Sequence, residues 1–113
     1  MYYLVTLEIN KSRVQQFIDV MPKVIESCVE AEAKLLSAVE YRTGKFNTYH
    51  HVWEIEDYNH YGKVLETFSA RPDIDHVLQM LAESVSSETV VFGETAAYFP
   101  GAGAAARSFG AIS

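Results

Sequence analysis

Residues 2–9 restrict the fold most, because they are apolar at both alternating positions of a strand except for Thr6 and Glu8. Side chains leave a strand alternately on its two faces, so such a run is typical of a central strand covered on both sides. Three further segments have the same β-rich character, namely residues 34–42, 47–55 and 88–99. One sheet with two faces to cover is therefore expected.

Helical patterns separate these strands. Apolar residues recur at intervals of three and four over residues 14–29, and the stripe continues in phase beyond Pro22, so we expect a bent but unbroken helix. Asp57 offers an N-cap for a second helix, which breaks at Pro72 and restarts over residues 74–81. The inner stripe of the second helix consists of Tyr61, Val64, Leu65 and Phe68.

The resulting order is strand, helix, strand, strand, helix, strand. With right-handed crossovers it predicts a ferredoxin-like α+β subunit, in which helices cover one face of a four-stranded antiparallel sheet. The chain encodes no second layer for the other face, so a second copy is the simplest cover. We therefore predict a homodimer built as a dimeric α/β barrel, with a higher oligomer left open.

Residues 1–99 are assigned to this domain. Residues 100–113 are rich in glycine and alanine and contain few large apolar groups, so we predict a flexible C-terminal tail. An alternative is that Phe109 and Ile112 anchor the tail on a partner subunit.

Composition excludes several classes of protein. The formal net charge is −6 and the nine basic residues are scattered, so nucleic acid is not an expected partner. The single cysteine, Cys28, falls on the apolar stripe of the first helix and is expected to be a buried thiol. No secretory signal is apparent, and no apolar stretch approaches the roughly 20 residues that span a bilayer. We expect a cytoplasmic protein without an integral membrane segment.

Residues 43–57 contain the most specific pattern in the chain. Gly44, Asn47, His51 and Trp53 form Gly-x-x-Asn-x-x-x-His-x-Trp, and Asp57 follows shortly after. In a domain of the predicted order this pattern resembles the NIPSNAP family. The resemblance extends more loosely over about residues 3–99, and it implies a dimeric α+β barrel of ferredoxin-like subunits.

One departure from the family concerns the first strand. Many NIPSNAP relatives have a Glu-x-Arg pair there, and the corresponding positions in this chain are Tyr3 and Val5. Any polar role of that pair in relatives is therefore not available to this chain in the same form.

Strand parity places Asn47, Tyr49, His51 and Trp53 on one face. We predict that they bind a small, partly apolar molecule in a barrel pocket, as expected of a NIPSNAP-like protein of unassigned biochemistry. His51 is the candidate catalytic residue, because similar barrels are used by cofactor-free monooxygenases and an imidazole transfers protons near neutral pH. The same residues are alternatively the packed core of the dimer.

No metal site or cofactor is predicted. His50 and His51 are adjacent on a strand, so they leave on opposite faces and cannot chelate one metal together. Haem needs only one protein ligand, so a haem-binding barrel stays open as an alternative. A non-enzymatic protein that recruits a partner through its tail or barrel rim is the other alternative.

Overall fold

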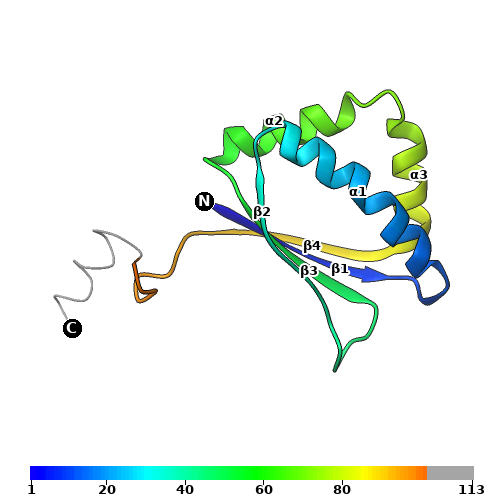
Figure 1. Cartoon of the computed structure of the whole chain (residues 1–113), viewed down its shortest axis with the longest axis horizontal. Coiled ribbons are helices and arrows are strands. Elements are labelled where there is room, and N and C mark those ends of the chain that lie inside the picture. The colour runs from blue at the N-terminus through cyan, green and yellow to red at the C-terminus, as the bar shows by residue number, and fades with distance from the viewer. Residues whose placement is uncertain (102–113) are drawn as a thin grey trace.

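The computed structural model of the chain describes residues 1–101, so most of the predicted tail, including Phe109 and Ile112, lies outside the described residues. The elements are β1 (Tyr2–Ile9), a 3-10 turn (Lys11–Arg13), α1 (Val14–Glu30), β2 (Lys34–Glu40), β3 (Thr48–Glu54), α2 (Tyr58–Ser69), α3 (Ile74–Ser84) and β4 (Val85–Gly93). The strands pair antiparallel in the order β2-β3-β1-β4. The helices lie on one side of this sheet (Figure 1). The predicted ferredoxin-like α+β fold is confirmed.

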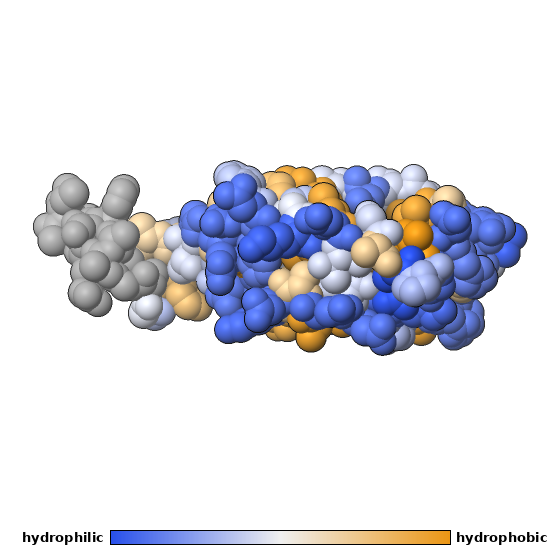
Figure 2. Space-filling model, turned by 90° about the horizontal axis from the view of Figure 1, so that it is seen from above, coloured by the Kyte–Doolittle hydropathy of each residue, from blue (hydrophilic) through white to orange (hydrophobic). Residues whose placement is uncertain are grey.

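Alternating burial along β1 distinguishes the two faces of the sheet. Tyr3, Val5, Leu7 and Ile9 are buried, whereas the residues between them are partly exposed. We call the side covered by the helices the inner face and the opposite side the outer face. The surface seen from above, over the helices, is largely hydrophilic (Figure 2), so the helix layer does not itself require a further cover.

Local chemistry explains how the helices begin and continue. Pro22 lies inside α1 without ending it, as predicted. Asp57 caps α2, because its side chain accepts a hydrogen bond from the His60 amide at 2.8 Å. The buried His60 ring accepts from the Glu56 amide through Nδ1 at 2.9 Å, so Nε2 carries the proton and donates to the Ala31 carbonyl at 2.6 Å. His60 is therefore a structural residue that joins α2 to the end of α1.

Arg71 holds the corner between α2 and α3 against α1. Its guanidinium donates to the Lys23 carbonyl at 3.0 Å and to Ser27 Oγ at 2.9 Å. It also donates to Asp73 Oδ1 at 2.8 Å. Because these bonds reach from the corner to α1, they position the start of α3 over the sheet.

Two boundaries differ from the sequence prediction. The last strand was expected over residues 88–99, but β4 spans Val85–Gly93. Its pairing ends where Gly93 meets Tyr2, the first residue of β1, so the chain beyond Gly93 has no partner strand among the described residues. The connection between β2 and β3 is also longer than the strand predictions of 34–42 and 47–55 implied, since β2 ends at Glu40 and β3 begins at Thr48.

No helix within residues 1–101 combines the length and the apolar character needed to cross a bilayer.

Candidate functional site

Three rows of side chains cross the inner face, and the strand register defines them. Running from β3 through β1 to β4, the rows are Trp53, Tyr3 and Phe92; then His51, Val5 and Val90; then Tyr49, Leu7 and Glu88. Successive same-face residues of a strand are roughly 7 Å apart. The inner face therefore changes along the strands from an aromatic row, through a row with an imidazole, to a row that ends in a carboxylate.

The aromatic row is where α2 docks on the sheet. The Tyr3 ring lies 5.8 Å from the Trp53 ring at an interplanar angle of 7°. Tyr61 of α2 meets Tyr3 at 5.0 Å and Phe92 at 5.0 Å, in both cases edge to face. Such geometries are favourable for aromatic pairs and add to the area that they bury. The row is a rigid, apolar end wall.

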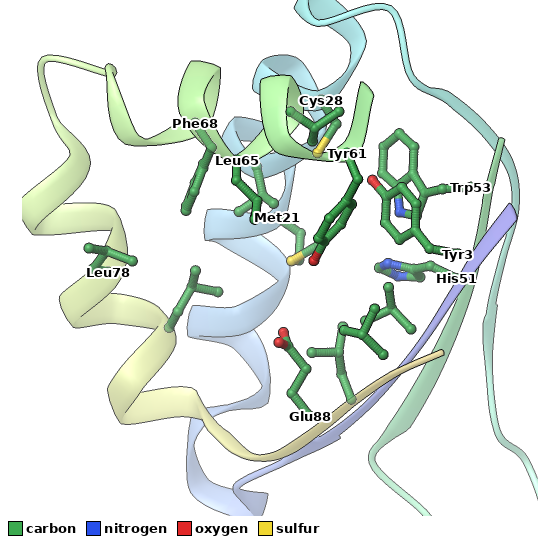
Figure 3. A pocket seen from close by; sticks show the side chains of 16 residues that line it. Tyr3, Met21, Cys28, His51, Trp53, Tyr61, Leu65, Phe68, Leu78 and Glu88 are labelled. Atoms are coloured by element: carbon green, nitrogen blue, oxygen red, sulfur yellow. The ribbon is translucent and has the colours of Figure 1, made fainter. Parts of the chain in front are cut away.

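A cavity of about 280 Å³ lies between the inner face and the helices (Figure 3). The sheet contributes Tyr3, Val5, Leu7, His51, Trp53, Glu88 and Val90. The helices contribute Met21, Val24, Cys28, Tyr61, Val64, Leu65, Phe68, Leu78 and Leu81. Leu65 and Leu78 are each 48% exposed, and Glu88 is exposed as well, so the mouth lies where α2, α3 and β4 approach one another.

His51 projects from β3 into this cavity (Figure 3). The residue is only 6% exposed, and its ring forms no hydrogen bond with any described residue. Every fully buried side-chain nitrogen or oxygen of residues 1–101 has a hydrogen-bond partner, so the ring nitrogens of His51 are not fully buried. The ring nitrogens are therefore directed at open space inside the cavity. Burial, with a smaller effect of His50, lowers the pKa of His51 from its ordinary value of 6.5. The imidazole is neutral at pH 7, with one nitrogen able to accept a proton or hydrogen bond.

The phenols and the thiol of the cavity stay protonated. Burial, followed by the nearby Cys28, raises the pKa of Tyr3. Burial, followed by the charge of Glu88, raises the pKa of Tyr61. Burial likewise raises the pKa of the Cys28 thiol, which is free and buried as predicted, so it is not a nucleophile at neutral pH.

The structure brings together two of the four ligand-binding residues predicted from the sequence. His51 and Trp53 both line the cavity. Tyr49 also faces inward, but its ring packs on Phe17 at 5.0 Å and does not line the cavity. Asn47 precedes β3 in the turn, and its carbonyl accepts a hydrogen bond from the Ile9 amide at 2.8 Å. A ligand contact by Asn47 or Tyr49 stays a prediction.

Asn47 and Gly44 both adopt left-handed backbone angles in the turn that leads to β3. Their φ angles are +57° and +74°. Glycine adopts this region without strain, and asparagine tolerates it better than most residues do. The spacing of the two residues in the motif is thus explained by the shape of the turn.

Sequence reasoning missed the polar groups that α2 and β4 add to the cavity. Tyr61 was predicted only as part of an apolar stripe, and Glu88 only as the start of the last strand. The signal for Glu88 is its parity, since it alternates with Val90 and Phe92 and therefore shares their face of the sheet.

No group of three or more His, Cys, Asp and Glu side chains in residues 1–101 is arranged to hold a metal ion.

The fold and the cavity define a class: a ferredoxin-like α+β domain with a largely apolar pocket between its sheet and its helices. No protein-family model matches the chain, and no curated protein matches it. Among solved structures, it is similar to an uncharacterized NIPSNAP domain protein from Burkholderia xenovorans, with 20% identity, a TM-score of 0.71, and coverage of 88% of this chain and 97% of that one. The expected resemblance to the NIPSNAP family is thereby confirmed at the level of the fold.

Two further structures show how widely this fold is used. A NIPSNAP family protein from Agrobacterium tumefaciens has a TM-score of 0.71 at 10% identity, covering 83% of this chain and 91% of that one. SnoaB, a cofactor-independent oxygenase from Streptomyces nogalater, has a TM-score of 0.62 at 11% identity, covering 88% and 95%. At these identities the likeness concerns the fold alone.

Proposed function

We propose that this chain is a NIPSNAP-like protein that binds a small, mostly apolar molecule in the cavity between its sheet and helices. His51 forms the polar contact with the ligand, and Trp53 provides an apolar wall. The observation that supports this best is the His51 ring itself, which is buried and neutral and has no hydrogen-bond partner among the described residues. A packed core histidine normally has such a partner, as His60 has in this protein.

The size and lining of the cavity favour a ligand of one or two rings. Ligand pockets usually measure roughly 300–1,000 Å³ and combine apolar walls with a few polar groups. At about 280 Å³ this cavity is just below that range. A porphyrin is much larger than one or two rings, so the volume favours a small organic molecule over haem.

If the bound molecule reacts, proton abstraction by His51 is the step that the site supports. A neutral imidazole with a free acceptor nitrogen takes a proton from an acidic O–H or C–H group, and the apolar walls exclude water from the resulting ion pair. The similarity in fold to a cofactor-independent oxygenase supports this form of the proposal. His51 is the only proposed catalytic residue.

Calorimetric titration with 2-naphthol tests the binding site, because its hydroxyl is on the ring system and can reach His51. This probe has two fused rings and one hydroxyl group. His51→Leu should weaken its binding about five- to tenfold, the equivalent of one hydrogen bond of roughly 1 kcal/mol. Leu78→Trp, which narrows the mouth, should abolish binding.

The matched control is His50→Leu, the same change at the neighbouring residue on the outer face. It should leave the dissociation constant within about twofold, since His50 does not line the cavity. Equal effects of the two leucine variants, or tight binding to Leu78→Trp, would show that the probe binds elsewhere.

We also propose that a second copy of the chain covers the outer face. Val52, Leu4 and Val91 are direct neighbours across three strands of that face, and Val91 is 48% exposed. A groove of about 330 Å³ continues this surface toward Phe99, which is also exposed. Contiguous exposed apolar surface of this kind marks an interaction site. Sedimentation should show a dimer at micromolar concentration, and a monomer would refute the proposal.

A further inference from the structure

The cavity contains a single ionised side chain. Of the 16 lining residues, none is Lys or Arg, and Glu88 is the only Asp or Glu. The other titratable groups are neutral at pH 7, because the pKa of His51 is lowered and the pKa values of Tyr3, Tyr61 and Cys28 are raised. Any charge on a ligand therefore meets one negative charge and no positive one.

Glu88 is placed to contact a ligand at the mouth. It stands opposite Leu7 on the inner face, and its carboxylate points from the sheet toward the Tyr61 hydroxyl (Figure 3). Within residues 1–101, no Lys, Arg or His side chain lies within ion-pair distance of it. The carboxylate is thus solvated at the mouth and available to a cation.

The neighbourhood of Glu88 favours a cation in two further ways. Tyr61 also lines the cavity and offers its phenol oxygen as a second acceptor. An anion would be repelled by Glu88 and would find no basic residue in the lining, and the formal net charge of the chain is −6.

The rows of the inner face give the length of the ligand. His51 of β3 pairs with Val5 of β1. Glu88 of β4 pairs with Leu7 of β1, so His51 and Glu88 are two strands apart and offset by one same-face step. Strand geometry places their Cα atoms on the order of 12 Å apart. The aromatic row of Trp53 and Tyr3 lies one step further from Glu88. An elongated molecule with rings at one end and a cation at the other spans this distance.

We infer that the ligand is an aromatic amine in its ammonium form, with a hydrogen-bonding group of its ring system at His51, the rings beside the Trp53 wall, and the ammonium group at Glu88 and Tyr61. This inference rests on the proposed function of the cavity. It adds the chemical class of the ligand and assigns Glu88 as the residue that determines specificity by charge.

Three probes with the same ring system test the inference by calorimetric titration: 2-(2-naphthyl)ethylamine, 2-(2-naphthyl)ethanol and 3-(2-naphthyl)propanoate. The wild-type protein should bind the amine about tenfold more tightly than the propanoate, with the alcohol between them. Added salt should reduce this preference, because the mouth is solvent-exposed. Glu88→Gln should bring the amine and the alcohol within about twofold of each other, and Glu88→Lys should reverse the order of amine and propanoate.

The control is Glu30→Gln, which makes the same change in net charge at an exposed residue of α1 that does not line the cavity. It should retain the wild-type preference. If the alcohol binds but the amine binds no better in the wild type, the inference is wrong while the proposed binding site survives. If none of the three probes binds, both fail. If Glu30→Gln abolishes the preference as Glu88→Gln does, the preference reflects net charge and the assignment of Glu88 is wrong.

Discussion

The two faces of the sheet have similar apolar strands but different surroundings. On the inner face Trp53 is 3% exposed and packs among aromatic rings beneath α2. On the outer face Val52, the preceding residue, is half-buried beside Leu4 without any helix above it. Burial thus depends on what covers a strand as well as on its composition. The apolar outer face is the part of the molecule that a partner would complete.

The largest difference between the faces should appear on truncation of adjacent residues of β3. Trp53→Ala removes a large buried aromatic and should lower the free energy of unfolding by about 3–5 kcal/mol. Val52→Ala should cost about 1 kcal/mol, because only a few partly buried methyl groups are lost. Urea unfolding followed by circular dichroism, at one fixed protein concentration, measures both. Similar costs would show that the two faces are equally packed.

A charge on the outer face should affect association rather than folding. Val91→Lys places an ammonium group in the middle of the proposed interface and should raise the dissociation constant of the dimer at least about tenfold. Gln79→Lys adds the same charge on the exposed side of α3 and should have no such effect. Sedimentation equilibrium distinguishes the two variants. Unchanged association of Val91→Lys would exclude this face from the interface.

The burial of His51 should make the free energy of unfolding depend on pH under acidic conditions. Its pKa is lowered in the folded state, so below pH 6.5 the unfolded chain takes up a proton that the folded chain resists. This group therefore causes stability to fall as the pH drops below about 6.5, whereas it has no effect on the pH dependence above that value. His51→Leu should show a shallower loss of stability on acidification in urea titrations from pH 7 to pH 5. An unchanged slope would mean that the His51 pKa is not lowered.

The smallest effect is expected from a polar pair on the outer face. Thr6 Oγ1 lies 3.1 Å from His50 Nδ1, and both residues are partly exposed. Thr6→Val keeps the shape of the side chain and removes this hydrogen bond, so it should change the free energy of unfolding by no more than about 1 kcal/mol. A cost of several kcal/mol, measured at the same fixed concentration, would show that the outer face is more tightly organised than its exposure implies.

Sequence periodicity was sufficient to predict the order of the elements, the antiparallel sheet and the shared face of His51 and Trp53. Each of these depends on a local repeat of two or of about 3.6 residues. The same rule did not place Asn47, because the strand starts only at Thr48 and the alternation does not extend into a left-handed turn.

The cavity itself could not be derived from periodicity. The helical stripe marked Leu65 and Phe68 as inward-facing, but a stripe does not tell whether such residues meet the sheet or leave a space above it. That depends on how α2 and α3 dock, which the contacts of Tyr61 and Arg71 determine. The position of Glu88 beside Tyr61 likewise follows from the register of β4 against β1.

The left-handed turn at Gly44 and Asn47 bears on how ligand preferences are compared between proteins that share this hairpin. Two such chains can have the same glycine and asparagine because both must reverse direction in the same way, whatever they bind. A common turn then indicates a shared backbone conformation and not a shared ligand. Differences in selectivity are better sought at the rim, where a single replacement at Glu88 or Leu78 changes the entrance and leaves the hairpin intact.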